Sequence, residues 1–363
     1  MRIGILTQPL HNNYGGLLQA YALQHFLKTL GHSPITVDFS SKRKPKLWGI
    51  KRIAINSIKK YILKHDIKFI MPINSKNTEE FITEYIDKTA KIATLDELSL
   101  LSQYNFDAYI VGSDQVWRPS YSPGMSAFFL EFLGGDTSIK RISYAASFGI
   151  DNCDEFSPED LIRYSALLKK FDAVGVREDS AVNLCDTHFG APSQQVLDPT
   201  LLLDKEDYDN IIQKKPSPPI VGDIMVYVLD QSDVKNKIIT TASEKLGLIP
   251  HNFLTDTSNN IYPSVSQWLS GFSKSKFVIT DSFHGVVFSI IFNKPFIVIG
   301  NESRGLTRFT SLLKTFNLEN RLISSPNEVN IIDTPIDFFE VNKIKKGKKA
   351  ESIDFIIRSL GNT

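Results

Sequence analysis

The chain is poor in cysteine, nearly neutral in net charge and without long apolar runs. Only Cys153 and Cys185 occur among its 363 residues, which excludes a disulfide framework and a cysteine-rich zinc site. A formal net charge of +1 gives no overall attraction to nucleic acid. Because no apolar run reaches the length that spans a bilayer, we expect a cytoplasmic protein. The opening residues, Met1 to Thr7, predict a strand rather than a signal peptide.

What the sequence has in abundance is short apolar segments that alternate with helical patterns. Hydrophobic residues make up 42% of the chain, enough for a large core. The repeated order of strand, polar loop and helix is typical of a doubly wound α/β fold. We predict two Rossmann-like domains that face a cleft, residues 1–204 and 223–363. They are joined by a charged, proline-containing linker at 205–222, and a helix at 350–360 ends the chain.

A basic segment interrupts the first predicted domain at residues 41–76. It contains many lysines and arginines but a single acid, Asp66, and isoleucines are interleaved with the basic residues. Two interpretations stay open. The segment is either a basic amphipathic surface that contacts anionic lipid head groups at the inner face of the membrane, or a solvated insertion packed on the domain.

The most informative stretch runs from Phe277 to Gly300. An apolar run at 277–279 predicts a buried strand, and Asp281 or Ser282 is a suitable N-cap for the helix that follows. His284 then lies in the first helical turn, at the carboxyl end of a strand, where free N–H groups form an anion site. The alternative is a histidine that is simply hydrogen-bonded in a helix cap.

Other loops after predicted strands contain further polar side chains. Arg177 is either a fork for phosphate or carboxylate or a surface ion pair with Glu178 or Asp179. No Walker loop, Gly-x-Ser-x-Gly elbow or metal-spaced His/Asp cluster is present, so we expect an anion-binding, acid–base site without a metal. The candidates are His11, Asn13, Asp114, Arg118, Arg177, Ser282, His284, Lys294, Arg304 and Arg308.

Five segments together resemble the polysaccharide pyruvyl transferase family. They are Tyr109-Ile-Val-Gly-Ser-Asp-Gln-Val-Trp117, Ile142-Ser-Tyr-Ala-Ala-Ser-Phe-Gly149, Val176-Arg-Glu-Asp-Ser180, Val196-Leu-Asp-Pro199 and Asp281-Ser-Phe-His-Gly285. The resemblance implies an arrangement like that of GT-B glycosyltransferases, with an acceptor-side N-terminal and a donor-side C-terminal domain. It also implies phosphoenolpyruvate as donor, no cofactor, and a sugar acceptor on a surface-polysaccharide precursor, expected to be a lipid-linked oligosaccharide. The product would be a pyruvate ketal.

The resemblance implies roles for His284 and Arg177, and the chemistry of the other loop residues gives further expectations. His284 is expected to act as a general acid or phosphate ligand, and Asp114 to orient or deprotonate the attacking hydroxyl. The expected donor ligands are Arg177, Ser282, Phe283, Gly285, Lys294, Arg304 and Arg308. The expected acceptor ligands are His11, Asn13, Tyr14, Ser113, Trp117 and Arg118.

The chain departs from the family pattern at two places. Many members carry Arg-Leu-His where this chain has Ser282-Phe283-His284, so we expect Arg304 or Arg308 to replace the missing arginine. Many members also read Gly-Asp where this chain has Gly15-Gly16. Two alternatives remain: a nucleotide-sugar glycosyltransferase of the same architecture, and a non-catalytic relative that binds sugar or protein.

Overall fold

The computed structural model describes residues 1–40, 74–215, 222–253, 261–300 and 305–361. The first half of the chain forms a six-stranded parallel sheet with the order β2-β1-β3-β4-β5-β6. Its strands are β1 (Arg2–Leu6), β2 (Ser33–Thr36), β3 (Ala108–Val111), β4 (Lys140–Ala146), β5 (Ala173–Val176) and β6 (Gln194–Gln195). Strands β3 and β4 are buried over nearly their whole length, as expected for a sheet covered on both faces.

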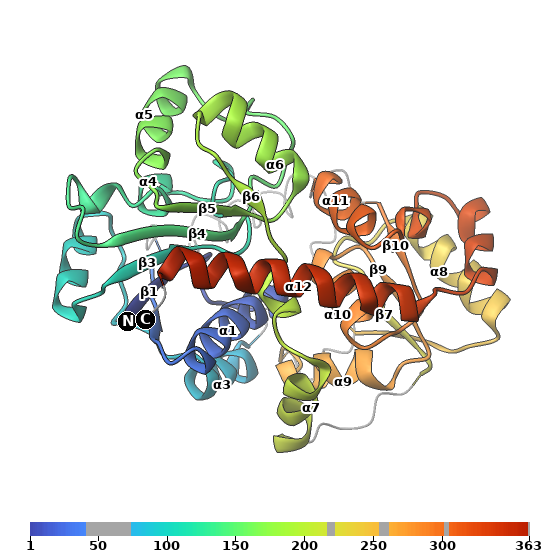
Figure 1. Ribbon diagram of the computed structural model, residues 1–363. Coiled ribbons are helices and arrows are strands. Elements are labelled where there is room, and N and C mark those ends of the chain that lie inside the picture. Colours follow the sequence, from blue (N-terminus) through green and yellow to red (C-terminus); the bar gives the residue numbers. More distant parts are fainter. Residues whose placement is uncertain (41–73, 216–221, 254–260, 301–304, 362–363) are drawn as a thin grey trace, which may run out of the picture.

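The second half forms a five-stranded parallel sheet with the order β11-β10-β9-β7-β8. Its strands are β7 (Ile224–Tyr227), β8 (Pro250–Asn252), β9 (Phe277–Thr280), β10 (Phe296–Ile299) and β11 (Leu322–Ile323). Figure 1 shows the two sheets side by side, each with helices packed on it. The predicted class, two Rossmann-like α/β units, is confirmed.

Capping side chains mark the first turns of several helices. Helix α1 starts at an Asn13 N-cap whose side chain accepts from Gly16 N, and α9 starts at a Ser264 cap. The helices of the first half are α1 (Tyr14–Thr29), α3 (Lys76–Tyr85), α4 (Met125–Phe128), α5 (Pro158–Leu168), α6 (Asp179–Leu184) and α7 (Lys205–Lys214). Those of the second are α8 (Asp233–Leu246), α9 (Val265–Lys274), α10 (Phe283–Ile291), α11 (Thr307–Thr315) and α12 (Phe338–Leu360).

The expected linker differs from the structure. Residues 205–214 form helix α7, because Asp204 and Asp207 make a capping box that stabilises its first turn. The rest of the expected linker at 216–221, and the basic segment at 41–73, lie outside the described residues.

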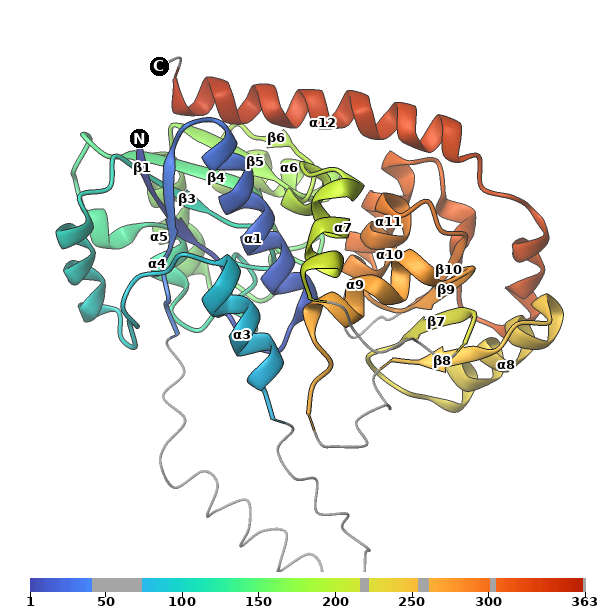
Figure 2. The same ribbon diagram turned by 90° about the horizontal axis from the view of Figure 1, so that it is seen from below.

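The terminal helix is longer than predicted and contacts both halves. Helix α12 begins at Phe338, where Asp337 accepts from Phe339 N, and extends across both units (Figures 1 and 2). Its Ser352 Oγ accepts from Leu197 N at 2.9 Å, so a helix expected in the second domain stabilises the first. The domain limits therefore stay a prediction. Within the described residues, no helix combines the length and apolarity needed to cross a membrane.

The largest apolar core is shared by the two sheets. The Tyr14 ring stacks on Trp268 with centroids 5.6 Å apart, and its hydroxyl donates to Pro263 O at 2.7 Å. Both rings are almost fully buried. Burial of such large aromatic surfaces stabilises one fixed placement of the first half on the second, and hence the loops that face each other between them.

Candidate active site

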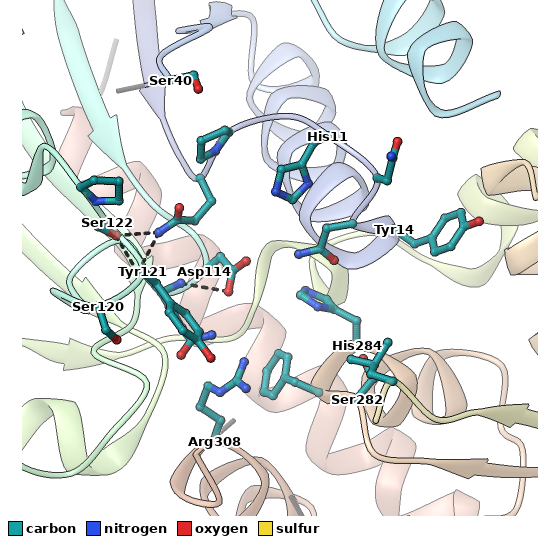
Figure 3. A pocket seen from close by; sticks show the side chains of 18 of the residues that line it. His11, Tyr14, Ser40, Asp114, Ser120, Tyr121, Ser122, Ser282, His284 and Arg308 are labelled. Carbon is teal, nitrogen blue, oxygen red and sulfur yellow. Dashed lines mark hydrogen bonds between the residues drawn. The ribbon is translucent and has the colours of Figure 1, made fainter. Parts of the chain in front are cut away.

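A cavity of about 1010 Å³ lies between the two halves (Figure 3). Its walls are formed by the loops that follow β1, β3, β7 and β9, together with the start of α11. These loops lie at the carboxyl ends of parallel strands, which is where open α/β sheets bind ligands. The N-termini of α1 and α10 both open at the cavity, so two positive helix ends face the same space.

His284 lies in the first turn of α10 and lines the cavity, as predicted. Its Nε2 lies 3.6 Å from Asp198 Oδ2, a fully buried carboxylate of the other half. On its other side the imidazole rests against the backbone of α1. A Cβ atom added at Gly15 would lie 2.0 Å from His284 Nδ1. Glycine is therefore required at position 15 by the histidine.

Ser282 is the N-cap residue of α10, and the neighbouring Asp281 instead contacts the loop after β7 and the start of α8. The Asp281 carboxylate is buried, accepts from Leu229 N at 2.7 Å and pairs with Lys235 Nζ at 2.6 Å. This contact joins the loop after β7 to the loop after β9. It holds the start of α10, and therefore His284, in place.

Arg177 lies near His284 but is enclosed by acids. Its guanidinium lies 3.0 Å from Glu178 Oε1, 3.2 Å from Asp198 Oδ2 and 3.7 Å from Asp114 Oδ1. Burial alone would lower the pKa of Arg177, but these three carboxylates together raise it above the ordinary arginine value. The expected surface ion pair is thus a buried one. Arg177 lines a small cavity of about 60 Å³ behind Phe283 rather than the large one.

Asp198 connects the two halves of the site. Its Oδ1 accepts from Thr200 N and Oγ1, while Oδ2 faces Ser113 Oγ, Arg177 and His284. Burial alone would raise the pKa of this carboxyl, but His284 and Arg177 hold it below its usual range. The anionic form is therefore favoured, and it faces both Arg177 and His284.

Arg308 contributes positive charge to the cavity wall. Burial and the nearby Arg177 lower the pKa of Arg308 to about 10, against the opposing effect of Asp114 and Glu178. Its guanidinium lies 5.9 Å from the Phe283 ring centroid, and Arg177 lies 4.2 Å from the same ring. At neutral pH Arg308 stays charged, and a buried guanidinium of this kind is well suited to bind an anion.

The remaining predicted residues divide into two groups. His11, Asn13, Tyr14, Ser282, Phe283 and Asp114 line the cavity with His284 and Arg308. Ser113, Trp117 and Arg118 are directed elsewhere. Ser113 is fully buried and donates to Ala145 O, and Trp117 lies in the core and donates to Phe128 O at 3.0 Å. Arg118 pairs with Glu155 at 3.0 Å.

Two further expected donor ligands, Gly285 and Lys294, lie elsewhere. Gly285 packs against β9, where an added Cβ would meet Thr280 Oγ1 at 2.2 Å. Lys294 follows the far end of α10 and does not line the cavity. Arg304 lies outside the described residues.

Sequence reasoning missed several cavity residues, above all Gln8, Tyr121 and Ser122. Gln8 lies in the turn after β1, and Tyr121 and Ser122 lie in the loop that follows Asp114. The sequence signal for this loop is the segment Pro119-Ser-Tyr-Ser-Pro123, which combines polar side chains with an aromatic one. In the part of the chain that the structure describes, no cluster of His, Cys, Asp or Glu is arranged to hold a metal ion.

Comparison with solved structures places the fold. UDP-GlcNAc 2-epimerase from Neisseria meningitidis bound to UDP-GlcNAc aligns over 99% of each chain with a TM-score of 0.53 and 11% identity. A putative UDP-N-acetylglucosamine 2-epimerase from Listeria monocytogenes aligns over 96% of this chain and 90% of its own, with a TM-score of 0.50 and 12% identity. Similarity at this level of identity concerns the GT-B-like fold alone, and it confirms the expected arrangement.

Comparison of sequences identifies the family. No curated protein matches the chain in sequence. The family model described as polysaccharide pyruvyl transferase matches residues 13–303, which include α1, the Asp114 loop, Asp198 and the start of α10. Because this match covers most of the chain, the protein belongs to the polysaccharide pyruvyl transferase family.

Proposed function

We propose that the protein transfers a pyruvyl group from phosphoenolpyruvate to two hydroxyls of a sugar in a polysaccharide precursor, forming a ketal. One observation carries the proposal. A single cavity holds an imidazole from the second half, His284, and a carboxylate from the first half, Asp114. The same cavity has a buried guanidinium, Arg308, in its wall.

The proposed donor site lies between the helix N-termini and Arg308. Phosphoenolpyruvate carries a phosphate and a carboxylate, and both are bound well by backbone N–H groups and by a guanidinium. Arg308 is the better donor ligand, because the charge of Arg177 is already balanced by three carboxylates. Arg308 thus supplies the positive charge that many family members carry on an arginine at the position of Ser282.

The proposed reaction begins with protonation of the donor methylene carbon by His284. The first sugar hydroxyl then forms a C–O bond to the donor C2, and Asp114 accepts its proton. The bond between C2 and the phosphate oxygen breaks, and the second hydroxyl completes the ketal. Of the two hydroxyl protons, one replaces the proton that His284 donated and the other leaves with phosphate, so the step balances without a metal or cofactor.

The surroundings of His284 support its role as a positioned acid. Asp198 lies on its Nε2 side and Gly15 on its Nδ1 side, so the ring has little freedom to turn. Imidazole changes its charge near neutral pH, and a positioned acid contributes about 10²–10⁴-fold to a rate.

An assay of phosphate release tests the proposal. The protein is incubated with phosphoenolpyruvate and galactose-, mannose- or glucose-type acceptors, with His284→Ala as the comparison. We expect phosphate release that depends on both substrates and falls at least about 10²-fold in the variant. No release with any acceptor, together with identical donor binding by the variant, would contradict it.

A thermal-shift experiment separates the alternatives. A ligand at 100 times its Kd stabilises the folded state by about 2.7 kcal/mol. Phosphoenolpyruvate should raise the melting temperature. A rise with a nucleoside diphosphate instead would favour the glycosyltransferase, and donor binding without turnover would favour a non-catalytic relative.

The proposal extends to a lipid-linked acceptor reached from the cytoplasmic face of the membrane. It rests on the basic composition of residues 41–76 alone. Co-sedimentation with liposomes tests it, and equal binding to neutral and anionic vesicles would end it.

A further inference from the structure

An exposed aromatic ring forms part of the cavity wall opposite the His284 turn. Tyr121 lies in the loop between β3 and α4, lines the cavity and is 39% exposed, although most tyrosines of the two cores are buried. Figure 3 shows its side chain projecting into the cavity, toward Arg308. An exposed aromatic side chain in a cavity offers a large, rigid apolar surface to a ligand.

One face of this ring is already covered. The Arg118 guanidinium lies 4.5 Å from the Tyr121 ring centroid, in cation–π geometry. Arg118 is itself fixed, because its Nε donates to Glu155 Oε1 at 3.0 Å and its Nη1 to Gln115 Oε1 at 3.2 Å. A ligand that stacks on Tyr121 therefore has to use the opposite face, and the Arg118 contact holds the ring before any ligand arrives. This preorganisation lowers the entropy cost of binding.

The backbone around the ring is equally well held. Tyr121 N and Ser122 N both donate to Arg118 O at 3.0 Å, and Ser120 N donates to Glu155 Oε2 at 3.0 Å. Gln8 from the loop after β1 donates to Ser122 Oγ at 2.7 Å. Ser122 is buried and its hydroxyl donates to Gln115 O at 3.0 Å, so it holds the loop. Ser120 and Gln8 line the same cavity as the ring and place a hydroxyl and an amide there.

We propose that Tyr121 is the platform on which a pyranose ring of the acceptor stacks, with Ser120 and Gln8 as hydrogen-bonding partners for its hydroxyls. A pyranose has an apolar C–H face and a polar rim, and the negative face of an aromatic ring attracts the C–H face. The inference rests on the proposed function and names the residues that select the sugar.

The placement also suits transfer. Tyr121 and Arg308 line the same cavity, and Figure 3 shows the Tyr121 side chain directed toward Arg308. A sugar stacked on Tyr121 therefore lies beside the proposed donor site, and Asp114, in the same loop region, lines the same cavity. The cavity of about 1010 Å³ leaves room for a sugar beside the small donor.

The experiment compares Tyr121→Ala, Tyr121→Phe and Arg118→Met with the unmodified protein. Phe339→Ala is the control, since Phe339 is an 82% exposed aromatic on α12 outside the cavity. The acceptor probes are the methyl glycosides of galactose, mannose and glucose. Binding is followed by saturation-transfer NMR, and turnover by the KM of each substrate.

We expect Tyr121→Ala to raise the acceptor KM at least about tenfold and to remove saturation transfer to one face of the sugar ring. The donor KM should stay within about twofold. Tyr121→Phe, which keeps the ring, should recover most of the acceptor KM, and Arg118→Met should fall between them. Phe339→Ala should match the unmodified protein.

Failure of this inference is distinct from failure of the proposed function. If the unmodified protein releases phosphate and Tyr121→Ala leaves the acceptor KM unchanged, the platform is wrong and the function stands. If phosphoenolpyruvate neither binds nor turns over, the function is wrong. Saturation transfer from the glycosides then still tests the platform, and its absence from the unmodified protein overturns it.

Discussion

Replacing Gly15 with alanine tests how closely the first helix holds the proposed acid. An alanine Cβ would lie 2.0 Å from His284 Nδ1, 2.2 Å from Cγ and 2.7 Å from Cβ. Ordinary contacts of a Cβ atom begin near 3.4 Å, so the imidazole has to move by about 3.4 − 2.0 = 1.4 Å. Because Asp198 lies on the other side of the ring, the movement also disturbs the contact between the two halves.

The neighbouring glycine is a matched control. Gly16 lies in the same helical turn, and an added Cβ would come no closer than 3.1 Å, to the Asn13 side chain. Both substitutions remove a helical glycine, which favours the helix by about 0.5–1 kcal/mol. Their difference therefore isolates the clash with His284.

A misplacement of about 1 Å costs on the order of 10²-fold in rate, so we expect kcat for phosphate release to fall by that factor in Gly15→Ala and little in Gly16→Ala. The imidazole resonances of His284 should shift only in the first variant. The double variant Gly15→Ala/His284→Ala should be no slower than His284→Ala alone, because both act through one side chain. Equal rates for the two glycine variants would refute the reasoning.

Three further predictions concern buried charges and thiols. Asp198→Asn should cost about 3 kcal/mol at neutral pH. Burial alone would raise the pKa of Asp198, but His284 and Arg177 lower it. The native carboxylate therefore stabilises the fold fully above about pH 4, and this effect is lost as the pH falls through the lowered folded-state pKa. The melting temperature of the variant should therefore depend less on pH in acid than that of the unmodified protein. Lys235→Met breaks the buried pair with Asp281 and should lower the free energy of unfolding in denaturant by about 3–5 kcal/mol. Lys276→Met breaks the exposed pair with Asp223 and should leave the unfolding midpoint unchanged. Burial raises the pKa of Cys153 to about 11 and of Cys185 to about 12, so neither thiol should react with a thiol reagent at pH 8 until the protein unfolds, and rapid reaction of the native protein would contradict this.

The sequence by itself determined the order of the elements and the place of the key histidine. Strand composition, the Asn13 and Ser264 caps and the apolar run from Phe277 are local signals, and each acts within a few residues of the element that it specifies. The position of His284 in the first turn of α10 follows from such a signal. Residues 205–214, part of the predicted linker, form a helix whose first turn a capping box of Asp204 and Asp207 stabilises.

Only the tertiary structure decided what surrounds that histidine. The contact of Gly15 with His284 and the enclosure of Arg177 by Asp114 and Asp198 join segments that lie far apart in the sequence. Side-chain type is visible in a sequence, but whether a guanidinium meets a ligand or a buried carboxylate depends on which loops converge. The packing of one sheet on the other sets that convergence, through contacts such as Tyr14 on Trp268 that have no local signature.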